Sequence, residues 1–163
     1  MEDLNGGRKR GIGLALGSGS ARGLAHIGVL KVFEREGIPI RAIAGASMGA
    51  LIGGLYAAGM SLEELEKIAL KATKRTVLSY IDPIPSLKGL MVGKRIEEML
   101  RSFIGNKDFS ELEIPVAIVA TDILTGEELV FRDKGDVVDA IRASISIPVV
   151  FVPVRVGGKT LVD

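Results

Sequence analysis

Apolar residues follow two different periods along this chain, and the two periods alternate from its beginning to its end. Short and largely apolar runs, which are typical of strands buried in a sheet, occupy residues 11–16, 40–44, 115–121 and 128–132. Apolar spacings of three and four residues, which are typical of amphipathic helices, separate most of these runs. The alternation of strands with helices predicts an α/β fold with a mainly parallel central sheet.

The helical spacing predicts five helices, and local signals mark several of their ends. Gly37 and Gly59 end the first two helices, and Ser61 with Glu64 forms a capping box at the start of the third. The second helix is expected over residues 47–58, and the last must end before Pro148. The apolar stripes of the other four helices are His26, Val29, Leu30 and Phe33; Leu62, Leu65, Ala69 and Ala72; Ile96, Met99, Leu100, Phe103 and Ile104; and Val137, Val138 and Ile141.

Glycine and proline mark the connections between these elements. Gly17–Gly23 is expected to be a loop, and Gly157-Gly158 is a hairpin signal between strands at 149–156 and 160–162. Asp82–Gly93 is expected to be either a lid or lipid-contact segment, or a plain surface loop. No internal repeat or domain boundary interrupts the pattern.

The composition narrows the class of protein. The chain has no cysteine, one histidine and a formal net charge of +1. It therefore has no disulfide framework and no thiolate metal site, and so small a charge does not favour nucleic-acid binding. The uncharged run at 42–62 is rich in small residues, and the polar first ten residues lack a signal-peptide core. We expect a soluble cytoplasmic protein with no bound metal and no nucleic-acid partner.

Residues 45–49 read Gly-Ala-Ser-Met-Gly, a G-x-S-x-G sequence between an expected strand and an expected helix. In this context the serine sits on a sharp, strained turn and its hydroxyl projects from the sheet edge. Gly45 and Gly49 remove side chains that would collide at such a turn, and the N-terminus of the following helix favours negative charge. Ser47 is therefore a candidate nucleophile, and close helix–strand packing is the structural alternative.

The segment Gly17–Gly23 (GSGSARG) has two interpretations. A glycine-rich loop between a strand and a helix can cradle a dinucleotide pyrophosphate. Its glycines follow G-x-G-x-x-x-G, however, which is one residue longer than the Rossmann pattern, and no convincing acidic residue follows. Alternatively, its backbone N–H groups stabilise an oxyanion in acyl transfer. The presence of both this loop and G-x-S-x-G favours the second interpretation.

A serine nucleophile needs a base to accept its proton. The only histidine, His26, is expected on the apolar face of the first helix as a packed core or site-wall residue. The base is therefore expected to be an aspartate that acts directly on Ser47 and that is partly desolvated beside it. The residues alone leave five candidates open, namely Asp122, Asp133, Asp136, Asp139 and Asp163.

Three segments carry a resemblance to a known family. They are Gly17–Leu30 (GSGSARGLAHIGVL), Gly45–Gly49 (GASMG) and Arg142–Pro153 (RASISIPVVFVP), which leads to Asp163. In order and spacing, and over nearly the whole chain, they resemble the patatin-like phospholipase family, specifically its small bacterial members. The resemblance implies a three-layer α/β/α fold, one catalytic domain over residues 1–163, and a Ser–Asp dyad that works without histidine.

Carried over residue by residue, the resemblance implies that Ser47 is the nucleophile. It also implies that Asp163, at the aspartate of the family's D-G-[GA] motif, is the base. Arg22 matches the basic residue of the family's glycine-rich block. The loop residues that the resemblance assigns to the oxyanion hole are Gly19, Ser20, Ala21 and Arg22.

The chain departs from the family pattern at two places. Ser18 and Ser20 stand where many members have glycine, which a backbone donor tolerates as long as φ stays negative. The chain stops at Asp163, so the family's following glycine is absent. We expect the natural chain to continue past Asp163, with glycine next.

The resemblance implies a serine esterase of lipid degradation that cleaves fatty-acyl esters, most plausibly those of phospholipids or lysophospholipids. No metal or organic cofactor is implied, and the expected partners are a lipid or acyl-ester substrate and, peripherally, the inner membrane surface. Three rival interpretations stay open: an acyltransferase with the same dyad, a catalytically silent interaction module, and a nucleotide-binding domain.

Overall fold

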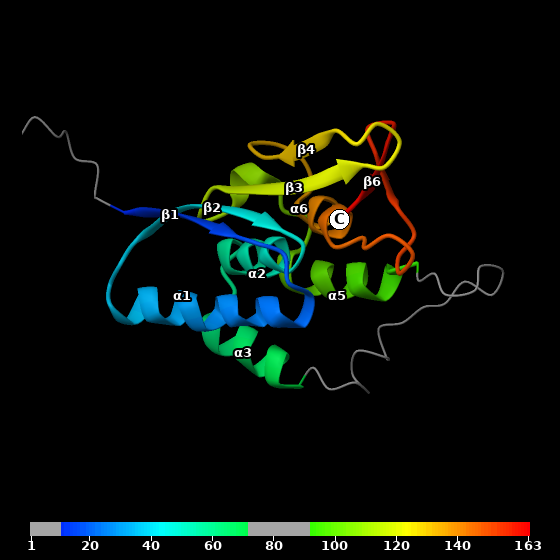
Figure 1. Cartoon of the computed structure of the whole chain (residues 1–163). Coiled ribbons are helices and arrows are strands. Elements are labelled where there is room, and N and C mark those ends of the chain that lie inside the picture. Colours follow the sequence, from blue (N-terminus) through cyan, green and yellow to red (C-terminus); the bar gives the residue numbers. More distant parts are fainter. Residues whose placement is uncertain (1–10, 72–91) are drawn as a thin grey trace, which may run out of the picture.

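The computed structural model describes residues 11–71 and 92–163 of the chain, and Figure 1 shows how its elements are arranged. Strands and helices alternate in the first half of the chain, and the second half adds the long strand β3 and three shorter strands. The elements in chain order are β1 (Ile12–Leu16), η1 (Ser20–Leu24), α1 (Ala25–Arg35), β2 (Ile40–Ala46), α2 (Met48–Ala57), α3 (Leu62–Lys71), α5 (Lys94–Ile104), η2 (Phe109–Glu111), β3 (Val116–Asp122), β4 (Glu128–Phe131), α6 (Val137–Ser144), β5 (Val154–Val156) and β6 (Lys159–Val162).

The strands form one mixed sheet with a parallel centre. β1, β2 and β3 are neighbours and run parallel, while β4, β6 and β5 join the sheet in antiparallel pairs. The main path through the sheet is β1-β2-β3-β6-β5, and β4 pairs with β3 off this path. Parallel neighbours need a crossover connection, and α1 supplies it between β1 and β2. The predicted α/β class with a mainly parallel core is therefore confirmed.

The helices α1, α2, α3 and α5 lie below the sheet in Figure 1. α2 approaches β2 closely, since a Cβ atom added at Gly53 would lie 2.8 Å from Ile43 Cγ2. α6 packs against β3 and α2, and a Cβ atom at Gly54 would lie 2.7 Å from Ile141 Cδ1. The fully buried large side chains of this core are Leu30, Ile43, Leu62, Leu100, Ile118 and Ile141.

The face of the parallel strands that lies opposite the helices carries small residues and is open to solvent. Gly13 and Ala15 of β1 and Ala42 and Ala44 of β2 are exposed, and they line a shallow hollow that also reaches β3. Parallel sheets are usually covered on both faces. The described residues thus supply two of the three layers that the resemblance implies, one of helices and one of strands.

The local elements differ from their predictions at several points. The expected loop at 17–23 contains the 3-10 helix η1, and the expected strand at 149–156 is formed only over Val154–Val156. Val29 and Phe103 were expected on buried stripes, but they are 46% and 48% exposed, because the buried face of each helix lies to one side of the predicted stripe, at Ile27 and Leu30 in α1 and at Leu100 and Ile104 in α5. The proposed lid lies mostly outside the described residues, since residues 72–91 are not described.

The uncharged run at 42–62 spans most of β2, all of α2 and the first residue of α3. Its glycines allow α2 to pack closely in the core, as shown at Gly53 and Gly54. Within residues 11–71 and 92–163, no helix combines the length and the apolar character needed to cross a membrane.

Candidate active site

Ser47 lies on the turn that joins β2 to α2, and its backbone is strained. Its φ of 52° and ψ of −118° place a non-glycine residue in a sparsely populated region. A Cβ atom at Gly49 would lie 1.9 Å from the carbonyl oxygen of Leu16, and one at Gly45 would lie 2.7 Å from the nitrogen of Ala50. The sharp turn and the need for both glycines, which G-x-S-x-G predicts, are therefore present.

Two strands share one edge of β3, and their ends point toward each other. β2 runs parallel to the first part of β3, with Ala46 opposite Val119. β6 runs antiparallel to the end of β3, with Val162 opposite Thr121, while β4 occupies the other edge. The register leaves only Ala120 between the two paired segments. The residues that follow β2 and β6 must therefore come together at Ala120.

Those two residues are Ser47 and Asp163. Ser47 Oγ donates a hydrogen bond of 2.6 Å to Asp163 Oδ2, a length typical of a hydroxyl bonded to a carboxylate. Ser47 is 5% exposed and Asp163 is half-buried, so water has limited access to the pair. The backbone N–H of Asp163 donates to the carbonyl of Ser146 at 3.0 Å, which fixes the direction of the chain there.

The other four candidate aspartates are engaged elsewhere. Asp122 accepts a backbone N–H in the turn after β3, at 3.1 Å. Asp136 and Asp139 both pair with Arg101 at 3.0 Å, and burial raises the pKa of Asp139. Asp133 is largely exposed and pairs with its neighbour in sequence. Of the five aspartates that the sequence leaves open, the structure brings only Asp163 to Ser47.

The glycine-rich segment lies beside Ser47 because it follows β1, the parallel neighbour of β2. Leu16 at the end of β1 pairs with Gly45, two residues before Ser47. η1 then packs on the start of α2, since a Cβ atom at Gly23 would lie 2.5 Å from the side chain of Met48. The glycine-rich segment and the first turn of α2 thus lie next to each other at the end of β2.

One backbone N–H group of this loop is already hydrogen-bonded, so fewer N–H groups are available to bind an oxyanion. The N–H of Arg22 already donates to the carbonyl of Gly19 at 3.0 Å, whereas the N–H groups before it precede the first helical hydrogen bond. Ser20 has a φ of 48°, so the condition of a negative φ, under which serine would be tolerated without strain, is not met at this position. Ser18 does not adopt a positive φ. The tight turn into η1 requires the left-handed conformation at Ser20, which a glycine would adopt without strain.

His26 lines the wall of this region. Its Nε2 lies 2.9 Å from the carbonyl oxygen of Gly17, which makes this ring nitrogen the donor. The side chain is half-buried on α1, and within the described residues no hydrogen bond joins it to Ser47. The geometry agrees with the interpretation of His26 as a site-wall residue.

Sequence reasoning missed Ser144, which touches Ser47 directly. The backbone N–H of Ser47 donates to Ser144 Oγ at 2.9 Å, and Ser144 is fully buried at the end of α6. A signal was present in the sequence, because Ser144 continues the helical spacing of Val137 and Ile141. A serine on an apolar stripe needs a hydrogen-bond partner in the core.

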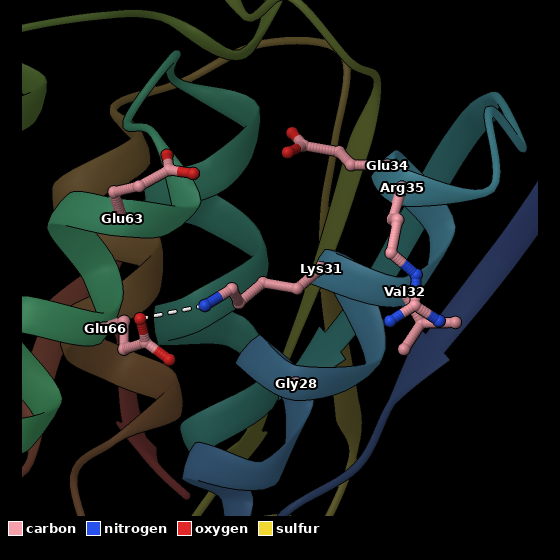
Figure 2. Close-up of a pocket in the computed structure, with 7 residues that line it drawn as sticks. All are labelled: Gly28, Lys31, Val32, Glu34, Arg35, Glu63 and Glu66. Carbon is pink, nitrogen blue, oxygen red and sulfur yellow. Dashed lines mark hydrogen bonds and ion pairs between the residues drawn. The ribbon is translucent and has the colours of Figure 1, made fainter.

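A larger groove lies away from these residues, between α1 and α3 (Figure 2). It has a volume of about 640 Å³, and an ion pair of 2.8 Å between Lys31 and Glu66 crosses it. Its lining residues are Gly28, Lys31, Val32, Glu34, Arg35, Glu63 and Glu66. None of the residues predicted for the catalytic site lines this groove, so the chemistry that the sequence indicates lies at the end of β2 instead.

Comparisons with known proteins show which family the chain is similar to. Residues 14–163 match the family model described as patatin-like phospholipase. The chain is 44% identical over 152 residues to an uncharacterised NTE family protein of Mycobacterium tuberculosis, a match that covers 93% of this chain and 42% of that protein. It is 30% identical over 158 residues to "Lysophospholipase NTE1" of Debaryomyces hansenii, covering 93% of this chain and 10% of that one.

A solved structure shows the same fold. The crystal structure of VipD from Legionella pneumophila matches with a TM-score of 0.66 over 94% of this chain and 45% of that chain, at 14% identity. The chain spans about two fifths of the length of its mycobacterial relative. With a family model that matches nearly all of its residues, the chain belongs to the patatin-like phospholipase family.

Proposed function

We propose that this protein hydrolyses fatty-acyl esters of phospholipids or lysophospholipids, with Ser47 as nucleophile and Asp163 as general base. The observation that carries the proposal is the hydrogen bond of 2.6 Å from Ser47 Oγ to Asp163 Oδ2. The family is that of patatin-like phospholipases, and one relative bears the name lysophospholipase. Both names support a lipid ester as the substrate.

In the first half of the reaction, Ser47 Oγ attacks the ester carbonyl while Asp163 takes its proton. The tetrahedral intermediate then collapses, the bond to the leaving alcohol breaks, and Asp163 returns the proton to that alcohol. The carboxylate needs no relay, because it already accepts the hydrogen bond that becomes the proton-transfer path. The acyl group remains on Ser47 as an ester.

The negative charge of the intermediate would be stabilised by backbone groups on two sides. Gly19 and the first two residues of η1, Ser20 and Ala21, offer their N–H groups, while that of Arg22 is already used. The N-terminus of α2, which begins at Met48, adds the favourable end of a helix dipole. These donors belong to the backbone, so no side-chain rotamer has to change for them to act.

In the second half, a water molecule attacks the acyl group on Ser47. Asp163 takes the proton of that water, the bond from the acyl carbon to Oγ breaks, and Ser47 regains its proton from Asp163. A fatty acid is released and the dyad returns to its starting state. Peripheral contact with a membrane surface stays a prediction.

The test combines a fluorophosphonate probe with release of fatty acid from lysophosphatidylcholine. We expect the probe to label Ser47, Ser47→Ala to keep less than about a hundredth of the hydrolysis rate, and Asp163→Asn to lose about a hundredfold or more. Asp133→Asn is the matched control and should behave as the unmodified protein, because Asp133 is exposed and remote. His26→Gln should keep about a tenth or more of the rate, because His26 is not the base.

Several outcomes would contradict the proposal. Unlabelled Ser47 in a folded protein would favour a silent interaction module, and loss of activity in His26→Gln equal to that in Ser47→Ala would restore a serine–histidine mechanism. Transfer of the acyl group to added glycerol or lysolipid in preference to water would identify an acyltransferase with the same dyad.

A further inference from the structure

The carboxyl-terminal end of α6 lies against both members of the dyad. Figure 1 shows the C-terminus of the chain beside α6. Ser144 Oγ accepts the backbone N–H of Ser47 at 2.9 Å, and the carbonyl of Ser146 accepts the backbone N–H of Asp163 at 3.0 Å. Both serines are fully buried. One helix end therefore holds the backbones of two residues that are far apart in the sequence.

We propose that Ser144 is a positioning residue, whose hydroxyl holds the backbone of Ser47 in its strained conformation and so directs Ser47 Oγ toward Asp163. This inference rests on the proposed function, since it assigns a role to Ser144 in the reaction of that same site. Ser144 is bonded to the backbone N–H of Ser47, whereas Ser47 Oγ is bonded to Asp163, so Ser144 acts through the backbone of Ser47.

The backbone of Ser47 needs an external hydrogen-bond acceptor. Ser47 is the N-cap of α2, so its N–H has no partner within that helix, and β2 ends one residue earlier at Ala46. A buried N–H without a partner is costly. The acceptor that the structure provides is Ser144 Oγ. The same bond opposes relaxation of Ser47 from its φ of 52° to an ordinary conformation.

α6 is well suited to serve as the fixed support. Val137, Val138, Ala140, Ile141 and Ala143 are fully buried, and the helix packs against β3, α2 and α5. Ser146 Oγ donates to the carbonyl of Arg142 at 2.7 Å, which continues the helical turn beyond Ser144. The guanidinium of Arg142 is itself buried, donates to the carbonyl of Val92 at 3.2 Å, and lies 5.5 Å from the ring centre of Phe151.

Loss of the Ser144 hydroxyl should therefore alter the position of Ser47 relative to Asp163, although both side chains of the dyad are still present. Without this acceptor the Ser47 turn can relax toward a less strained φ, which rotates the Cα–Cβ bond and moves Oγ relative to Asp163. A misplacement of about 1 Å in a reacting group can cost about a hundredfold in rate. Substrate binding should change little, because Ser144 is fully buried.

The test measures fluorophosphonate labelling of Ser47 over a range of probe concentrations, which separates the limiting labelling rate from the apparent probe affinity. In Ser144→Ala we expect the limiting rate to fall by about tenfold to a hundredfold, with apparent affinity within about twofold of the unmodified protein. Ser144→Cys, which replaces the hydroxyl with a somewhat larger thiol that accepts hydrogen bonds weakly, should label almost as slowly.

Ile141→Val is the matched control for loss of stability, because Ile141 is buried on the same helix and has no polar atom in its side chain, and its Cδ1 lies against α2 at Gly54. We expect it to lower the melting temperature while its limiting rate stays within about twofold. Labelling of Ser144→Ala and Ser144→Cys at the unmodified rate would overturn the positioning role and leave the proposed function standing. If Ser47 of the unmodified protein is not labelled, the proposed function is wrong, and the positioning role that rests on it is wrong as well.

Discussion

Gly49 allows the closest approach of two backbone segments at the candidate site, and Gly49→Ala tests that approach. A Cβ atom there would lie 1.9 Å from the carbonyl oxygen of Leu16 and 2.4 Å from its carbonyl carbon. Both contacts are with backbone, which cannot rotate away as a side chain can. To reach ordinary contact distances, β1 and α2 would have to separate by about 1.5 Å.

The expected cost of Gly49→Ala follows from this displacement. Overpacking a core costs about 1–3 kcal/mol and occasionally more. Because the strand itself must move, we expect the free energy of unfolding to fall by about 3 kcal/mol or more. For a chain of this length such a loss lowers the melting temperature by about 6–12 °C. Hydrolysis should fall as well, because the loop that we propose as the oxyanion hole begins directly after Leu16.

Gly28→Ala is a matched control on another helix. Gly28 lies within α1, is exposed, and has nothing within 4 Å of an added Cβ atom. Alanine within a helix is more stable than glycine by about 0.5–1 kcal/mol, so Gly28→Ala should stabilise the protein by about that amount. The same chemical change is therefore expected to have opposite signs at the two positions.

Urea unfolding followed by circular dichroism measures both variants, since the chain has no tryptophan for fluorescence. The slope m should remain unchanged, so that a shift of the midpoint reports a change of stability. If Gly49→Ala unfolds within about 0.5 kcal/mol of the unmodified protein, the close approach of β1 and α2 is wrong.

Two further predictions concern strain and pH. Val149 is a β-branched residue with a φ of 71° and is 84% exposed, so Val149→Gly should relieve strain with little loss of packing and raise the unfolding free energy by about 1 kcal/mol; a less stable variant in urea unfolding would contradict this. Hydrogen bonds from the backbone N–H and hydroxyl of Ser110, and then from the N–H of Gly135, lower the pKa of Asp108 below its usual 3.8. Asp108 therefore stabilises the folded protein above about pH 4, and this contribution is lost as pH falls through the lowered pKa. The stability difference from Asp108→Asn should shrink in acid, and equal differences at pH 7 and pH 2 would exclude the effect.

Features that depend only on residues close together in the sequence could be predicted from it. The capping box at Ser61 forms as expected, with Glu64 accepting from the Ser61 N–H at 3.2 Å and from its hydroxyl at 2.9 Å. The turn at Ser47 is likewise local, because Gly45 and Gly49 are needed within a few residues of the serine they flank. Backbone conformation and helix capping act over one helical turn, so the order of residues is sufficient to indicate them.

The buried side of each helix could not be read from its apolar period alone. Val29 and Phe103 continue the predicted stripes of α1 and α5, yet both are about half exposed, whereas Ile27 lies off the predicted stripe of α1 and is buried. The period indicates that a helix has an apolar face, whereas the neighbouring elements decide which side of that face is buried.

The choice of Asp163 from five aspartates was decided by tertiary structure. All five have the same side chain, and local sequence gives none of them a distance to Ser47; the family resemblance pointed to Asp163, but only by its place in a motif. The sheet register decides the distance, because β2 and β6 meet on one edge of β3 and bring Oγ within 2.6 Å of Oδ2. The contact of Ser144 with Ser47 arises in the same way, from packing of α6 on the sheet. A hydrogen bond requires its two atoms to lie about 3 Å apart, and for residues distant in sequence only the folded chain sets that separation.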